Sequence, residues 1–381
     1  MNGLELQEAP GQAAAQVCSL DTYLAAPDDS MAERIAAARQ KLAGQAIVLG
    51  HHYQRDEVLR FADITGDSYK LSRAAADSHA RFMIFCGVHF MAETADVLAR
   101  PGQQVILPDL NAGCSMADMA EIGQVETCWD ALLRHGLAPT HTARPPLIPL
   151  TYMNSAAEIK AFCGERGGLV CTSSNARRAF TWAFERAQRI LFLPDQHLGR
   201  NTALAMDIPP SHIVVWDPYQ LNGGLTPDRL AAAQVILWKG HCSVHQRFLP
   251  EHVDRIRRVH PAMRVIVHPE CRAEVCRMAD AVGSTEQIIQ AIEDAPPGAS
   301  FAVGTEIHLV NRLARRFAPH GKHIVTLDES GCLCTTMYRI SPQHLAWALE
   351  NLVEGRVVNP IRVDEPVKHW ARVALQRMLE V

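Results

Sequence analysis

One plan of apolar strands and helices recurs three times along this chain, and it limits the fold more than any single motif does. The first copy begins at "AIVLGHHYQRDEV", the second at "PLIPLTYMNSAAEI" and the third at "RVIVHPECRAEV". Each continues as a polar tip, a helix, a turn of small hydroxyl residues, a second helix and further apolar strands. Runs of Val, Ile and Leu that alternate with helices indicate parallel strands buried on both faces. We therefore expect an α/β protein made of three units with related topology.

The repeat divides the chain into four predicted segments. These are a variable, partly disordered N-terminal extension (1–30), a first α/β unit (31–140), a second unit (141–260), and a third unit together with C-terminal helices (261–381). In α/β units of this kind, functional side chains follow the carboxyl ends of the strands. The three units are therefore expected to bring these ends together.

Composition excludes several classes of function. The 381 residues are 48% hydrophobic and carry a formal net charge of −4, which argues against nucleic acid as a partner. The sequence contains no run of 18 apolar residues, so no membrane span is predicted. The N-terminal residues lack the pattern of a signal peptide. The cytoplasm is the expected compartment. Its thiol pool keeps cysteines reduced, so the eleven cysteines are not expected to pair as disulfides.

Each copy of the plan ends at a cysteine. Cys114 lies 63 residues after His51, and Cys332 lies 64 residues after His268, while Cys242 ends the enlarged second copy. Cys334 lies two residues beyond this register, so it is expected to be a packed thiol near Cys332. The remaining cysteines are interpreted as core residues or carry no motif: Cys86, Cys163, Cys171, Cys271 and Cys276 as core, Cys18 and Cys128 without a motif.

Three cysteines from three units suit one type of metal site. A closed structural zinc site needs four ligands, whereas a 4Fe–4S cluster held by three thiolates leaves one iron open to substrate. That iron would polarise a hydroxyl or carbonyl oxygen as a Lewis acid. Spacing alone does not exclude an alternative, in which Cys114, Cys242 and Cys332 are three core cysteines at equivalent buried positions.

The polar tips favour the metal site. Each unit has a pair of polar residues directly after an apolar strand, where side chains project from the sheet: His51 and Tyr53, Tyr152 and Asn154, His268 and Glu270. Ser68 and Thr285 each follow the tip by 17 residues, and Ser173 is their counterpart. These hydroxyls are interpreted as helix caps or as anion ligands at helix N-termini, and one residue can do both.

Ten motifs resemble the quinolinate synthase family. They include "IVLGHHYQRDEV", "GDSYKLS", "AGCSMADM", "TYMNSAAEIKAF", "CTSSNA", "WKGHCSVHQRF", "VHPEC" and "ADAVGSTEQII", and together they span roughly residues 45–350. The resemblance implies three α/β/α sandwich domains with parallel sheets, related by pseudo-threefold symmetry around a central 4Fe–4S cluster, one cluster per subunit.

The resemblance also implies roles for individual residues. Cys114, Cys242 and Cys332 match the cluster ligands. Glu270, His268, Tyr53 and Tyr152 fall on catalytic positions, with Glu270 and His268 as the general base. Substrate-binding positions are His51, Ser68, Tyr152, Asn154, Ser173, His268, Glu270 and Thr285. The implied reaction is a transfer that joins iminoaspartate to dihydroxyacetone phosphate, releases phosphate and water, and forms quinolinate for NAD biosynthesis.

Other readings remain open at the level of sequence. The chain can be a related iron–sulfur hydro-lyase with another substrate, a cluster-based redox sensor or electron carrier, or an α/β binding protein with buried thiols. An electron carrier normally completes its cluster with a fourth protein ligand and needs no constellation of His, Tyr and Glu. A functional link to an enzyme that produces iminoaspartate follows only from the quinolinate synthase resemblance.

Overall fold

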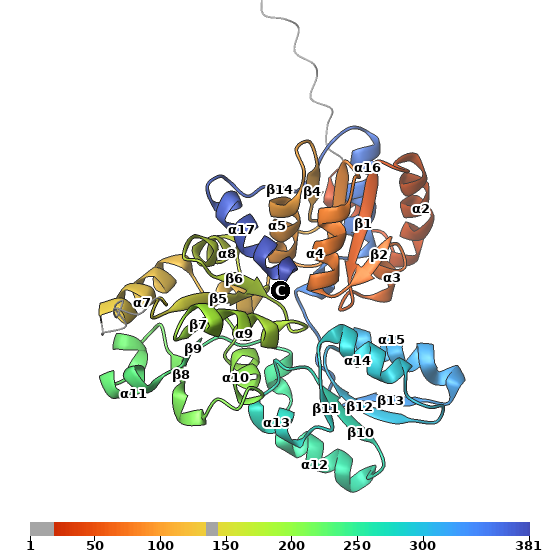
Figure 1. The fold of residues 1–381 in the computed structure, drawn as a ribbon. Helices are drawn as coiled ribbons and strands as arrows, with labels where there is room; N and C mark the ends of the chain where they lie inside the picture. Colours follow the sequence, from red (N-terminus) through yellow and green to blue (C-terminus); the bar gives the residue numbers. More distant parts are fainter. Residues whose placement is uncertain (1–18, 135–143) are drawn as a thin grey trace, which may run out of the picture.

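A computed structural model describes residues 19–134 and 144–381 of the chain. Cys18 and most of the predicted N-terminal extension lie outside the described residues. The chain forms an α/β structure with three separate sheets, which occupy three lobes (Figure 1). Within the described ranges, no helix is both long enough and apolar enough to cross a membrane.

The first unit carries a parallel sheet with one added edge strand. Its strands are β1 (Ala46–His51), β2 (Ile64–Gly66), β3 (Phe82–Cys86) and β4 (Gln104–Ile106), and its helices are α1 (Leu20–Leu24), α2 (Met31–Lys41), α3 (Asp56–Leu59), α4 (Ser68–Asp77), α5 (His89–Leu98) and α6 (Ser115–Asp118). All five residues of β3 are buried, as expected for a strand covered on both faces.

The second unit is the largest. Its strands are β5 (Ile148–Tyr152), β6 (Leu169–Cys171), β7 (Ile190–Leu193), β8 (Ile213–Trp216) and β9 (Val235–Trp238), and its helices are α7 (Ile122–Arg134), α8 (Ala157–Glu165), α9 (Ala176–Arg186), α10 (Gln196–Leu204) and α11 (Pro227–Ala232). Strand β8 pairs with β9 in parallel and extends the sheet beyond the four-strand plan.

The third unit repeats the plan and leads into a C-terminal segment. Its strands are β10 (Arg264–Val267), β11 (Ala281–Val282), β12 (Ser300–Gly304) and β13 (His323–Thr326), and its helices are α12 (Pro250–Val259), α13 (Ala273–Met278), α14 (Thr285–Glu293) and α15 (Ile307–Phe317). The segment after it contains α16 (Pro342–Val353), β14 (Pro360–Ile361) and α17 (Val367–Glu380).

The three sheets share one strand order. The core orders are β2-β1-β3-β4, β6-β5-β7-β9 and β11-β10-β12-β13, and every pair within them is parallel. The first strand of each unit therefore has its second strand on one side and its third on the other. This is the point of an open α/β sheet where ligands bind, at the carboxyl ends of the strands.

The helix before the first strand of the second and third units packs into the core of that unit. Helix α7 packs its Val125 and Leu132 into the core of the second sheet, and α12 packs its Val253 into the core of the third. Each unit thus begins with the helix that precedes its first strand, which the predicted boundaries at 140 and 260 assigned to the unit before.

The C-terminal segment packs on the first and second units. Helix α16 packs against α1 and α2, β14 pairs antiparallel with β4, and α17 packs against α8 and β6 (Figure 1). The loop between β13 and α16 consequently leaves the third unit and crosses toward the first. Cys332 and Cys334 are on this loop.

Candidate functional site

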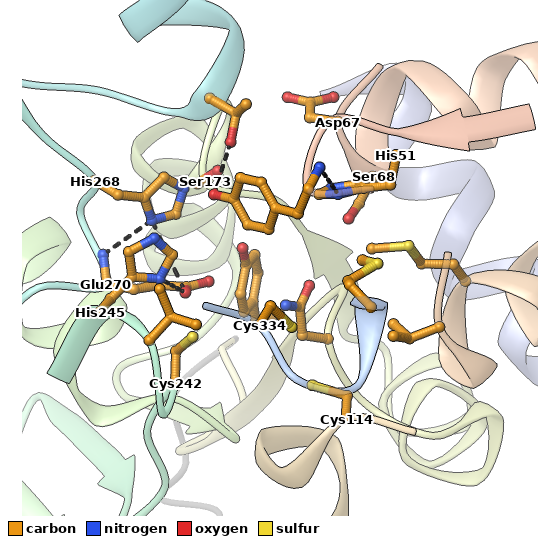
Figure 2. A pocket seen from close by; sticks show the side chains of 18 of the residues that line it. His51, Asp67, Ser68, Cys114, Ser173, Cys242, His245, His268, Glu270 and Cys334 are labelled. Atoms are coloured by element: carbon orange, nitrogen blue, oxygen red, sulfur yellow. Dashed lines mark hydrogen bonds and ion pairs between the residues drawn. The ribbon is translucent and has the colours of Figure 1, made fainter. Parts of the chain in front are cut away.

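One cavity gathers residues from all three units. Every predicted site residue except Cys332 lines it: His51, Tyr53, Ser68, Cys114, Tyr152, Asn154, Ser173, Cys242, His268, Glu270 and Thr285. The lining also includes Cys334 and His245 (Figure 2). The cavity therefore joins the carboxyl ends of three sheets to three cysteine-bearing loops.

Equivalent strands position the polar tips. His51 and Tyr152 are the last residues of β1 and β5, and His268 directly follows β10. In the first and third units the histidine also makes the same local contact. His51 Nδ1 accepts the Tyr53 backbone N–H at 3.1 Å, and His268 Nδ1 accepts that of Glu270 at 3.3 Å. Nδ1 is thus an acceptor in both rings, which leaves the proton on Nε2.

Burial keeps both histidines neutral. Burial lowers the pKa of His268 to about 3, with a further contribution from the neighbouring His245. The pKa of His51 is likewise well below its usual range because of burial and the adjacent His52. Neither side chain is charged at neutral pH, so both can donate an N–H without holding a cation in the cavity.

Glu270 lies at the centre of a buried hydrogen-bond network. Its side chain is 2% exposed, and its Oε2 accepts the His245 Nδ1–H at 2.6 Å. The nearby Tyr152 hydroxyl also lowers the pKa of this carboxylate. Burial alone would raise the pKa of Glu270, but His245, His268 and the Tyr152 hydroxyl outweigh it and hold the pKa at about 2. We refer to Glu270, His245, His268 and Tyr152 as the Glu270 network.

A chain of hydroxyl groups continues from this network. His245 Nε2 lies 3.1 Å from Thr305 Oγ1, which is 2.9 Å from the Tyr53 hydroxyl. That hydroxyl also lies 3.1 Å from Thr285 Oγ1. Burial and the charge of Glu270 raise the pKa of Tyr53 and of Tyr152 well above the usual value. Both phenols therefore remain protonated and can donate hydrogen bonds.

Helix N-termini supply a third kind of group. Ser68 and Thr285 are the first residues of α4 and α14, and the capping side chains are those of Asp67 and Ser284, one residue earlier. The interpretation of Ser68 and Thr285 as caps is therefore wrong by one position. Asn154 Oδ1 is buried, and it has no hydrogen-bond partner within the described ranges. This oxygen is therefore suited to accept a hydrogen bond from a bound ligand.

Three cysteines share a local conformation, and we call these segments the cysteine turns (114–117, 242–245 and 334–337). In each, backbone N–H groups two or three residues later donate hydrogen bonds to the sulfur. The donors are Met116 and Ala117 for Cys114, His245 for Cys242, and Thr336 and Met337 for Cys334. Such N–H groups stabilise a thiolate and tune metal-bound sulfur.

Cys332 is placed differently from the sequence expectation. It is fully buried, and its Sγ lies 3.8 Å from the Asp328 carboxylate. Burial and this carboxylate raise the pKa of Cys332 to about 12. Its backbone carbonyl accepts the Ile307 N–H at 3.1 Å, which fixes Cys332 against α15, while Cys334 reaches the cavity. The structure thus groups Cys114 and Cys242 with Cys334 and not with Cys332.

The donor set fits an iron–sulfur cluster. Three sulfurs, each from a different loop, face one cavity, and soft thiolates suit iron–sulfur chemistry. Burial raises the pKa of Cys114 to about 12, and it also raises the pKa of Cys242 and Cys334. The thiols therefore hold their protons until a metal displaces them. The buried ammonium of Lys160 acts on Cys114 as a favourable positive charge.

Sequence reasoning missed four residues of this site. His245, Thr305, Glu306 and Cys334 carry contacts that join distant segments. A signal existed for Cys334, because it lies eight residues after the end of β13 at Thr326, as Cys114 lies eight after the end of β4 at Ile106. His245 follows Cys242 by three residues in "HCSVH", but its contact with Glu270 depends on the tertiary fold.

Comparisons with known proteins decide the family. The sequence family described as "Quinolinate synthetase A protein" matches residues 33–380. Relatives named quinolinate synthase include a protein of Acidobacterium capsulatum, 69% identical with 99% of this chain and 100% of the relative covered. The chain belongs to the quinolinate synthase family. Two further relatives with this name are from Nocardioides sp. (57% identity, 93% and 90% covered) and Streptomyces coelicolor (54%, 92% and 88%).

Membership of the quinolinate synthase family accounts for the motifs that suggested it. The matched range contains all three sheets and every residue of the cavity. The chain is thus an enzyme of this family, and the cavity between its three units is its candidate active site.

Proposed function

We propose that this chain is a quinolinate synthase, a transferase that joins iminoaspartate to dihydroxyacetone phosphate and releases phosphate and water. The observation that carries the proposal is the single cavity, in which three cysteines meet a buried carboxylate with protonated phenols and neutral imidazoles around it. The shared strand order of the sheets supports a pseudo-threefold arrangement of three sandwich domains around this cavity.

We infer that Cys114, Cys242 and Cys334 hold one 4Fe–4S cluster. The N–H donors of the cysteine turns support this set, and the carboxylate beside Cys332 opposes the alternative, because a negative charge disfavours thiolate formation. With three protein ligands, the bound cluster supplies a Lewis acid for a substrate hydroxyl or carbonyl oxygen.

Hydrogen-bond donors that suit anionic substrate groups also line the cavity. The N-termini of α4 and α14 direct backbone N–H groups and the hydroxyls of Ser68 and Thr285 toward it, and helix N-termini favour carboxylate and phosphate. Ser173 and Asn154 complete this lining. Two substrates with carboxylates and a phosphate need a binding surface of this kind.

Glu270 is the proposed general base. It is deprotonated at neutral pH and can take a proton from the carbon of an enolisable triose. A bound anionic substrate raises the pKa of a nearby carboxylate, which brings Glu270 closer to the basicity that the step needs. Tyr53 and Tyr152 stay protonated and orient substrate oxygens, and His51 and His268 donate as neutral imidazoles.

This set of groups favours catalysis over electron transfer. An electron carrier has no need of a deprotonated carboxylate held beside donors in a substrate-sized space. In the proposed role the chain acts in the cytoplasm in NAD biosynthesis. Iminoaspartate then comes from a separate enzyme that oxidises or dehydrates a suitable precursor.

The test is an anaerobic product assay. The protein is purified without oxygen, reconstituted with iron and sulfide, and incubated with dihydroxyacetone phosphate and freshly generated iminoaspartate. Quinolinate that accumulates over many turnovers, and only when both substrates are present, supports the proposal. Iron-loaded protein that consumes neither substrate overturns it.

A further inference from the structure

Three side chains of metal-binding types lie close together at the candidate active site. Cys242 Sγ, a ring nitrogen of His245 and a carboxylate oxygen of Glu270 all lie within 4.8 Å of one another. His245 is 1% exposed and Glu270 2%, and both side chains face the cavity together with Cys242 (Figure 2). One sulfur, one imidazole nitrogen and one carboxylate oxygen form a donor set typical of catalytic zinc, with a fourth position left open.

The distances leave room for an ion with little movement. His245 Nδ1 and Glu270 Oε2 are 2.6 Å apart around one shared proton. Zinc bonds of about 2.0–2.2 Å to nitrogen and oxygen place two tetrahedral ligands roughly 3.3 Å apart. A zinc ion therefore replaces the shared proton after a shift of under about 1 Å. The protons of the Cys242 thiol and of His245 Nδ1 leave to solvent.

The surroundings hold the ligands in place. Thr305 Oγ1 lies 3.1 Å from His245 Nε2 and accepts its N–H once Nδ1 binds the ion. The His245 ring also stacks on His268, with centroids 4.4 Å apart. Outer-shell contacts of this kind set the tautomer and orientation of metal ligands.

We propose that Cys242, His245 and Glu270 form a mononuclear zinc site in the protein that lacks an iron–sulfur cluster. The zinc site stands on these contacts alone. A consequence rests on the proposed function: since both metal centres need the Cys242 thiolate, zinc and cluster exclude one another. Zinc would also remove the proposed general base from the reaction.

Cobalt titration of the cluster-free protein tests the site. We expect one Co²⁺ per chain, with tetrahedral ligand-field bands and a sulfur-to-cobalt charge-transfer band, and displacement by Zn²⁺. Cys242→Ser removes the charge-transfer band. His245→Gln and Glu270→Gln weaken binding by roughly 10–100-fold or more, since even outer-shell partners contribute that much. Circular dichroism of each variant confirms that it is folded.

Two matched controls separate this site from the three-cysteine set. Cys114→Ala and Cys334→Ala leave all three zinc ligands in place, so both bind Co²⁺ as the unaltered chain does. Loss of the charge-transfer band in either control puts the ion among the three cysteines and overturns the proposal. Equal binding by Cys242→Ser and the unaltered chain identifies adventitious surface metal and also overturns it.

Cluster reconstitution with and without prior zinc loading tests the exclusion. We expect iron incorporation to fall with the fraction of chain that holds zinc. Equal incorporation in both samples contradicts the exclusion while leaving the proposed function intact. Failure of the zinc-free sample to take up iron contradicts the proposed cluster instead, so the two failures are distinguishable.

Discussion

The cysteine turns and the Glu270 network line one cavity but are built in different ways. Each cysteine turn holds its sulfur with backbone N–H groups from the next few residues. The Glu270 network instead joins side chains from different units, so the protonation of each group depends on the others. A change of a turn cysteine should therefore remove the proposed cluster and leave Glu270 in place, whereas a change at Glu270 should leave the proposed cluster and remove the chemistry.

The largest expected effect is loss of the metal from a cysteine turn. Cys334→Ser, Cys114→Ala and Cys242→Ala should each abolish cluster assembly, because each removes one of the three proposed ligands. Cys332→Ser is the matched control and should retain iron and sulfide, since Cys332 faces Asp328. Iron and sulfide analysis after anaerobic reconstitution measures the difference. Iron retained in Cys334→Ser and lost in Cys332→Ser would restore the assignment based on repeat register.

The second largest effect is expected from a substitution in the Glu270 network. Glu270→Gln should keep the cluster and lower turnover by roughly 10²–10⁴, the contribution of a positioned general base. The amide preserves the shape but cannot accept the proton. Quinolinate formation per bound cluster is the measurement, and Glu274→Gln, an exposed carboxylate on α13, is the control. Near-normal turnover in Glu270→Gln rules out this residue as the base.

A smaller effect is expected from the support of one turn. Buried Glu306 accepts the Cys334 backbone N–H at 3.4 Å and that of His308 at 2.8 Å. Glu306→Gln should lower metal affinity by about 10–100-fold, the usual cost of losing an outer-shell partner. Competition with an iron chelator measures this, with exposed Glu329→Gln as the control. Unchanged affinity means that the Cys334 turn holds its own conformation.

The smallest effect concerns the neutral histidines. The native pKa of His268 is about 3, against 6.5 for an unperturbed histidine. Between pH 7 and pH 5 the unfolded chain binds a proton that the native chain does not. The free energy of unfolding should therefore fall with decreasing pH, by up to about 1.4 kcal/mol per pH unit from this residue, and stay constant above pH 7.

Chemical denaturation of the metal-free protein at several pH values measures this slope. His268→Gln should reduce it by about one proton, whereas His323→Gln, which alters an exposed histidine, should leave it unchanged. An equal slope in all three proteins shows that His268 is protonated in the native chain. The neutral-imidazole role of His268 would then be wrong.

The strand-end residues could be predicted from sequence, whereas the third cysteine was ambiguous, because the count from His268 favours Cys332 and the count from the end of β13 favours Cys334. His51, Tyr152 and His268 end equivalent parallel strands, and hydrogen-bonded register carries such residues to one edge of a sheet. The number of residues from His268 to Cys332 instead includes loops. A loop has no fixed rise per residue, so its length in sequence does not fix where its last residue lies. Contacts of the loop with Glu306 and Ile307 place Cys334 at the cavity, and no local pattern encodes them.

The three-unit plan followed from the sequence because each unit repeats one order of apolar strands and helices. The packing partners of the C-terminal segment did not, since an apolar helix face indicates that the face is buried but not which surface covers it. Contacts such as that of Asn175 Nδ2 with the Met378 carbonyl join α17 to the second unit, and they depend on residues about two hundred positions apart. Pairing over such separations leaves no periodic signal.

The position of the cavity between three sheets has a consequence for how the molecule unfolds. Each unit supplies one cysteine turn and one strand end, so no unit encloses a ligand by itself. A group bound by all three units links them to one another. Its binding stabilises the native chain by RT ln(1 + [L]/Kd), and this stabilisation is lost when the units separate. The loaded protein should then melt as one cooperative body, while in the empty protein the third unit is held with less stabilisation against the first two, whose shared core persists.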